Sequence, residues 1–155
     1  MKSIILILMF ACTVLADIDF KKELEPLKSI GPKVFDVKTF DKTEKADLIL
    51  VDFWASWCEP CKEGFAYYEE KIKAQKNKKI VLISVNLDDS EDKAQAFLKS
   101  YPQNNAIVWD EKKKMMALLN FDAIPMMLVL DKDWKEIGRI KGFNSESKKK
   151  LAKFF

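Results

Sequence analysis

The stretch that decides the fold is residues 48–61, whose sequence is LILVDFWASWCEPC. Residues 48–54 are almost continuously apolar and rich in strand formers, which predicts a buried central strand. Two cysteines separated by two residues follow, where a helical pattern begins. The free N–H groups and partial positive charge of a helix N-terminus favour a thiolate, the nucleophile in disulfide exchange. Because Cys61 would lie about one helical turn beyond Cys58, the stretch predicts a redox-active cysteine pair.

The remaining composition narrows the chemistry open to this pair. The 155-residue chain has no histidine, which excludes Ser/His and Cys/His nucleophile systems and histidine-containing zinc sites. Cys12 lies in an N-terminal leader, and the two other cysteines cannot complete a four-ligand structural zinc site alone. We therefore expect no metal and no organic cofactor. A structural disulfide is the alternative, but the adjacent Trp57 and the interposed Pro60 favour redox chemistry.

The charge pattern excludes a nucleic-acid site. The formal net charge is only +3, and acidic residues lie between the short lysine clusters. Such a pattern is typical of solvated helix and loop faces rather than of a basic patch. With 48% apolar and 33% charged residues, the chain has the composition of one soluble globular domain.

Residues 1–16 form a secretory signal peptide pattern. A lysine at position 2 precedes an apolar run over residues 4–14, and a polar stretch begins at Asp17. The run is shorter than the roughly 20 residues of a membrane span. We expect cleavage after Ala16 and a periplasmic or extracytoplasmic location. An uncleaved anchor and lipidation at Cys12 are the alternatives, although Phe10 is too bulky for a good lipidation motif.

Along residues 17–155 the pattern predicts one α/β domain, a mixed sheet with helices on both faces. The helices are expected at 19–30, 58–76, 91–101, 111–119 and from Ser145, which would cap the last one. The strands are expected at 34–40 on the sheet edge, 48–54, 80–87, 106–109, and as a hairpin at 126–130 and 136–140. Residues 41–46 are expected to form a polar turn.

At these residues the chain resembles the thioredoxin superfamily, and within it the exported TlpA/ResA-like thiol–disulfide oxidoreductases. Residues 51–62 carry the resemblance, which extends from about 32 to 142. Residues 85–89 resemble the extra strand–helix unit of the exported members, and residues 123–125 resemble the loop that bears the cis-proline of the family. The resemblance implies a thioredoxin-like fold with an N-terminal strand extension. The motif dipeptide Glu59-Pro60 resembles that of proteins that reduce apocytochrome c cysteines.

The resemblance also implies a role for each site residue. Cys58 would be the exposed attacking thiol and Cys61 the buried resolving thiol. Asp52 would lie beneath the pair as a buried carboxylate with a raised pKa that relays the proton of Cys61. From the residues alone, Asp52 could instead sit at an edge and reach water. Trp57 would shield the disulfide and offer an apolar docking surface.

The same family loop implies a substrate-binding role for Ile124 and Pro125. The Ile124–Pro125 peptide bond would be cis, and the backbone beside it would pair with an extended substrate segment. A trans proline at the start of a strand is the alternative.

Three positions depart from the family pattern. Gly64 stands where ResA-like members carry a glutamate, and the neighbouring Glu63 is shifted by one residue. Ala66 replaces a helix-kinking proline, which predicts a straighter helix. Trp134 replaces the glycine that is usual in the late hairpin, which leaves the geometry of that turn open.

These observations predict an exported thiol–disulfide oxidoreductase that acts on protein dithiols or disulfides, as a monomer with a membrane electron donor. The acidic Glu59 disfavours a thiolate, so we expect a reductant rather than an oxidant. One alternative is a binding or adaptor protein whose cysteines are idle. A peroxidase of the same fold is the other, but Arg139, the only arginine, lies far along the chain.

Overall fold

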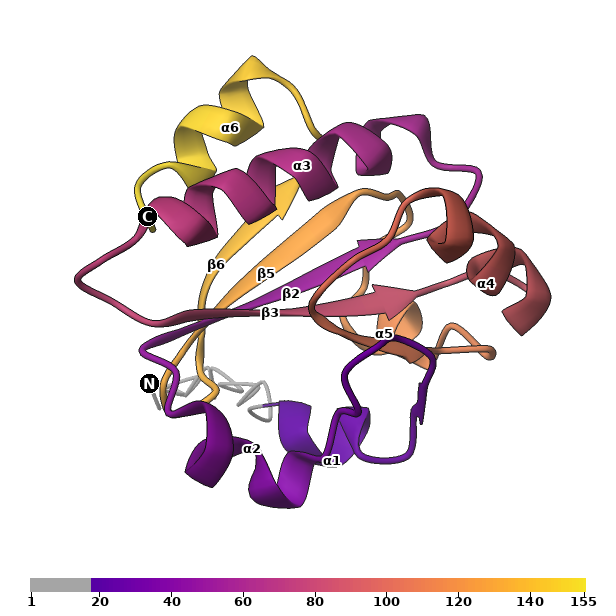
Figure 1. The fold of residues 1–155 in the computed structure, drawn as a ribbon, viewed down its shortest axis with the longest axis horizontal. Helices are drawn as coiled ribbons and strands as arrows, with labels where there is room; N and C mark the ends of the chain where they lie inside the picture. Colours follow the sequence, from indigo (N-terminus) through magenta and orange to yellow (C-terminus); the bar gives the residue numbers. More distant parts are fainter. Residues whose placement is uncertain (1–17) are drawn as a thin grey trace, which may run out of the picture.

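The computed structural model describes residues 18–155, and the predicted leader with Cys12 and Ala16 lies outside them. Figure 1 shows a mixed sheet with helices on both faces. The six strands, in the spatial order β1-β4-β3-β2-β5-β6, are β1 (Lys28–Ser29), β4 (Ala106–Trp109), β3 (Ile80–Asn86), β2 (Leu48–Trp54), β5 (Met126–Asp131) and β6 (Glu136–Lys141). β2 is parallel to β3 and antiparallel to β5. The predicted fold class is confirmed.

The helices form two layers around the sheet. They are α1 (Phe20–Leu24), α2 (Val37–Glu44), α3 (Glu59–Ala74), α4 (Glu91–Ser100), α5 (Lys114–Leu118) and α6 (Ser145–Leu151). In Figure 1, α3 and α6 cover one face and α1 and α2 the other. One buried cluster joins α1, α2 and α5 to the sheet, and two further clusters lie under α3, α4 and α6.

The alternation of side chains along β2 decides what lies beneath α3. Successive strand residues point to opposite faces. Ile49, Val51 and Phe53 belong to the cluster under α1 and α2, whereas Leu50 and Trp54 belong to the clusters under α3. Asp52 therefore points to the α3 face, the side on which the cysteines lie.

The N-terminal region differs from the prediction. The expected strand at 34–40 is wrong, because Val37–Glu44 is the helix α2. Asp36 starts it by accepting a hydrogen bond from the Lys38 N–H at 3.0 Å. The expected turn at 41–46 is largely the second half of this helix, which ends at Lys45 in the left-handed region. The edge strand of the N-terminal extension is β1, which pairs antiparallel with β4.

Three further predictions need correction at their ends. The expected helix at 111–119 begins only at Lys114. The expected helix at 19–30 covers only Phe20–Leu24, because β1 takes over the last part of that segment. The cap of α6 is Asn144 rather than Ser145, because the Asn144 side chain accepts hydrogen bonds from the Glu146 and Ser147 N–H groups.

Trp134 settles the open geometry of the late hairpin. It takes the left-handed conformation that glycine usually supplies, with φ 66°. Its indole N–H donates to Asp41 at 3.0 Å, and its ring lies edge-on to Phe40 with centroids 4.9 Å apart. Packing against α2 therefore holds a large side chain at a glycine-type position.

Candidate active site

Cys58 and Cys61 form a disulfide where β2 gives way to α3. Their Cα atoms are 5.3 Å apart. Cys58 is the N-cap residue of α3, and Pro60 lies in the first turn, where its missing N–H costs no helical hydrogen bond. The Cys61 N–H donates to the Cys58 carbonyl at 3.1 Å. The pair thus sits at the positive end of a 16-residue helix, which stabilises a thiolate at Cys58 once the disulfide is reduced.

The disulfide is more enclosed than expected. Only 4% of Cys58 and 2% of Cys61 is exposed, so the expectation of an exposed Cys58 is wrong for this oxidised form. Both cysteines belong to a buried cluster with Trp54 and Phe65, and Ile124 packs against that cluster. Trp57, in contrast, is 68% exposed. The surface that a partner would meet first is therefore the indole of Trp57 rather than a sulfur atom.

Asp52 is a buried carboxylate with no neutralising partner. It is 1% exposed, and neither Oδ1 nor Oδ2 has a hydrogen-bond partner among the described residues. Burial raises its pKa to about 8. The prediction of a buried carboxyl with a raised pKa is confirmed, and the edge alternative is wrong. At neutral pH this carboxyl is mostly protonated, so it can give up or take a proton close to the working pH.

Two hydroxyl-bearing residues lie around Asp52. Ser84 is its register partner on β3, and the Ser84 Oγ accepts a hydrogen bond from Asn105 at 2.8 Å. Burial, together with the negative charge of Asp52, raises the pKa of the Tyr68 hydroxyl. A Cβ atom added at Gly64 would lie 2.9 Å from this hydroxyl, so the Tyr68 ring occupies the space beside Gly64. Glu63 is exposed and contributes no buried carboxylate to the site.

The Ile124–Pro125 peptide bond is cis, and the alternative of a trans bond is wrong. The Pro125 carbonyl accepts a hydrogen bond from the Gly142 N–H at 2.8 Å, which ties this loop to the end of β6. Ile124 is partly buried against the cluster that contains both cysteines. Ile124 thus lies against the same buried cluster as the disulfide, as the predicted substrate-binding role for Ile124 and Pro125 would require.

Asp88 is a structural support of the site to which the sequence analysis gave no role. It is fully buried, and its carboxylate accepts hydrogen bonds from the Ser56 N–H at 3.0 Å and the Ser56 hydroxyl at 2.9 Å. The Asn86 side chain donates to the same carboxylate at 2.9 Å. Asp88 therefore fixes the loop between β2 and Cys58. In the sequence, Asp88 is visible only as part of the acidic pair Asp88-Asp89 after an apolar strand. Such a pair is just as typical of the residues before a helix.

The charge of Glu59 is balanced within the motif. Its carboxylate forms an ion pair with Lys62 at 2.6 Å, and the Lys62 amine lies 5.4 Å from the centre of the Tyr101 ring. The hydrogen bond that the Lys62 amine donates to the Glu59 carboxylate raises the pKa of Lys62. The repulsion that Glu59 exerts on a thiolate at Cys58 is therefore partly offset by a cation one helical turn away.

Within residues 18–155, no group of three His, Cys, Asp or Glu side chains is placed to hold a metal ion. In the same part of the chain, none of the helices has the length and apolar character needed to cross a membrane.

The residues of this site lie within the part of the sequence that matches a known protein family. The family described as Thioredoxin-like matches residues 46–136, which is more than half of the chain and includes the cysteine pair and Pro125. The chain therefore belongs to the thioredoxin-like family. A solved structure described as a putative thiol:disulfide interchange protein DsbE from Chlorobium tepidum superposes with a TM-score of 0.68 at 27% identity, covering 83% of this chain and 90% of that one.

The names of curated relatives also describe thiol–disulfide exchange. The thiol-disulfide oxidoreductase ResA of Bacillus subtilis is 27% identical over 99 residues, covering 64% of this chain and 55% of the relative. ResA of Bacillus cereus is 26% identical over 130 residues, covering 83% and 65%. The sporulation thiol-disulfide oxidoreductase A of B. subtilis is 30% identical over 108 residues, covering 64% and 66%. The chain thus spans between about half and two thirds of the length of these relatives.

Proposed function

We propose that the protein is a thiol–disulfide oxidoreductase whose Cys58–Cys61 pair exchanges with disulfides of protein substrates. The observation that supports it best is the disulfide itself, at the N-terminus of α3 beside the exposed Trp57 and the cis-Pro125 loop. The names of the relatives describe the same activity.

The exchange proceeds in two steps. In the reduced protein, the Cys58 thiolate attacks one sulfur of a substrate disulfide, forming a mixed disulfide and releasing one substrate thiolate. Cys61 then loses its proton and attacks the Cys58 sulfur, which releases the second substrate thiolate and leaves Cys58–Cys61 oxidised. The two electrons pass to the substrate, whose thiolates take up protons. We assign the acceptance of the Cys61 proton to the ionised form of Asp52, which is a minority form at neutral pH because its buried carboxyl has a pKa of about 8.

We further infer that the protein works as an exported reductant. Export follows from the leader pattern of residues 1–16, and the motif dipeptide Glu59-Pro60 suggests apocytochrome c cysteines as substrates. A membrane protein would then return electrons to the pair, because an exported dithiol meets an oxidising compartment. The ion pair of Glu59 with Lys62 limits how strongly Glu59 opposes the thiolate, so we expect a moderate rather than an extreme reduction potential.

Insulin reduction tests the activity. The protein, supplied with a dithiol, should precipitate insulin B chains, and the Cys58→Ser variant should not. Equal rates for the two proteins would favour the adaptor alternative, in which the fold only binds. Titration of the pair against glutathione tests the direction, and a potential as oxidising as the roughly −120 mV of DsbA would contradict a reductant. Trapping with Cys61→Ser, which leaves the mixed disulfide unresolved, would then identify the substrates.

A further inference from the structure

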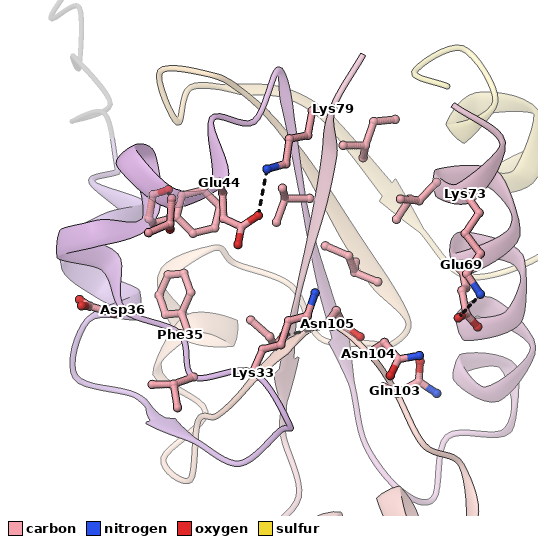
Figure 2. A pocket seen from close by; sticks show the side chains of 18 of the residues that line it. Lys33, Phe35, Asp36, Glu44, Glu69, Lys73, Lys79, Gln103, Asn104 and Asn105 are labelled. Carbon is pink, nitrogen blue, oxygen red and sulfur yellow. Dashed lines mark hydrogen bonds and ion pairs between the residues drawn. The ribbon is translucent and has the colours of Figure 1, made fainter. Parts of the chain in front are cut away.

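A groove runs along one edge of the sheet, apart from the cysteine pair. Its volume is about 500 Å³, and none of Cys58, Cys61, Trp57 and Pro125 lines it. Figure 2 shows the α2 side of the groove facing α3 across a strand. The walls are largely apolar, with Phe35 and Phe40 on the α2 side, and Phe65 and Ile72 on the α3 side. Val34, at its rim, is 81% exposed.

The groove contains a strand edge whose neighbour stops short. β4 begins at Ala106, opposite Ile83, so that among the described residues no strand lies beside Ile80–Leu82 on this edge. The Lys79 carbonyl and the Leu87 N–H both bond toward β2. Because backbone groups of successive strand residues point to opposite edges, those of the even-numbered residues face away from β2, toward the groove. Such an edge is a template for another extended chain.

Three lysines and three carboxylates line the groove, and one of the lysines, Lys33, has no ion-pair partner among the described residues, nor does Asp36. Lys79 pairs with Glu44 at 3.3 Å, and Lys73 pairs with Glu69 at 2.6 Å. In Figure 2 the Lys33 amine extends into the groove toward Asn105, which is next to the start of β4.

We propose that this groove binds the C-terminal end of a partner polypeptide as an added strand parallel to β3. Free backbone donors and acceptors select an extended main chain over a lipid. A chain lying beside Ile80–Leu82 meets the start of β4 at Ala106 and must end there, which places its carboxylate near Lys33. Its side chains point alternately to the two walls, and both walls favour apolar residues.

Residues 154 and 155 of this chain do not fill the groove. Phe154 and Phe155 of the same chain pack against the core cluster under α3 and α6, and the Phe154 carbonyl accepts a hydrogen bond from Lys78 at 2.8 Å. The paired stretch is three residues long, about 10 Å at roughly 3.3 Å per residue. The proposal is thus a tripeptide end with apolar side chains and a free carboxylate, and it does not depend on the redox function.

Fluorescence anisotropy with labelled peptides tests the proposal. The probe is a pool of N-terminally labelled pentapeptides with Val, Ile, Leu or Phe at the last three positions and a free carboxylate. The same pool as C-terminal amides removes the charge, and a pool N-methylated on the backbone of these three positions removes the donors for strand pairing. We expect saturable binding of the free-acid pool, about tenfold weaker binding of the amide pool, and loss of binding of the N-methylated pool.

Two variants localise the binding. Lys33→Gln should bind the acid and amide pools equally, whereas Lys42→Gln, an exposed lysine of α2 outside the groove, should bind like the unchanged protein. Absence of saturable binding, equal affinity of the acid and amide pools for the unchanged protein, or equal affinity of the N-methylated pool would each overturn the proposal. Loss of binding in Cys58→Ser would assign the peptides to the cysteine site and also overturn it. Insulin reduction by Lys33→Gln should be unchanged, so failure of the groove and failure of the redox function are distinguishable.

Discussion

Asp52 links the stability of the fold to pH. Between about pH 4 and pH 8 an unfolded aspartate is ionised, whereas the buried Asp52 holds its proton because its pKa is about 8. The native state then binds more protons than the unfolded state, so this residue lowers the free energy of unfolding as pH rises, with a limit of about 1.4 kcal/mol per pH unit. Below pH 4 both states are protonated and the effect vanishes.

We therefore expect the stability gained by Asp52→Asn in the oxidised protein to grow from almost nothing at pH 4 to at most about 5 kcal/mol at pH 8. Urea unfolding at both pH values measures the difference. The control is Asp122→Asn, which changes an exposed carboxylate. A stability difference between Asp52→Asn and the unchanged protein that is equal at both pH values would contradict the assignment. If Asp52 also takes the Cys61 proton, insulin reduction by Asp52→Asn should be slower.

We predict that Ile124 limits access to the disulfide. It packs against the cluster that encloses Cys58 and Cys61, so Ile124→Ala should open a path to the sulfur atoms. We expect several-fold faster reduction by a phosphine reductant, followed by alkylation of the released thiols. Ile137→Ala, at a position on β6 that is 48% exposed, is the matched control. If both variants are reduced at the rate of the unchanged protein, Ile124 does not gate the pair.

At the scale of elements, the loop between β2 and α3 depends on Asp88. Asp88→Ala removes the acceptor of the Ser56 and Asn86 hydrogen bonds and leaves these donors without their partner. We expect a loss of about 2–4 kcal/mol in the free energy of unfolding, together with reduced insulin reduction. Asp89→Ala, which removes an exposed ion pair with Lys93, should cost less than about 1 kcal/mol. Similar losses for the two variants would show that the loop does not depend on Asp88.

The sequence predicted best the elements whose pattern of apolar residues fits only one kind of secondary structure. β2 and β4 match their predicted bounds, and β3 differs by one residue, because short apolar runs rich in strand formers fit only a buried strand. The strand prediction for residues 34–40 failed because Val37 and Phe40 are three residues apart. This spacing fits one face of a helix as well as the loose alternation of a strand. The cap at Asp36 was the missed signal.

At the scale of the molecule, the sequence predicted the position of the cysteine pair but not how it is enclosed. The strand–helix junction follows from local pattern, whereas Cys58 is buried in a cluster with Phe97 and Ile107, which lie 39 and 49 residues further along the chain. The groove could not be predicted either. It exists because the first residue of β4, Ala106, pairs with Ile83, three residues after the start of β3. The enclosure of the cysteines and the groove both depend on the relative positions of elements that are distant in the sequence. The sequence of each element alone therefore gives no sign of them.

The N-terminal region outside the family match is part of the same core. The match begins at residue 46, yet Phe20, Leu24 and Phe40 are at most 5% exposed and lie in the cluster with Phe53. Burial of three such side chains stabilises the fold by about 5–9 kcal/mol, which is comparable with the whole stability of a typical domain. A chain of residues 46–155 should therefore lose cooperative unfolding and bind a hydrophobic dye, although it keeps both cysteines. The comparison is a chain of residues 18–155 in the same buffer, followed by near-UV circular dichroism during urea titration. A shorter chain that unfolds in one transition at the midpoint of the longer one would show that α1 and α2 are dispensable for the core.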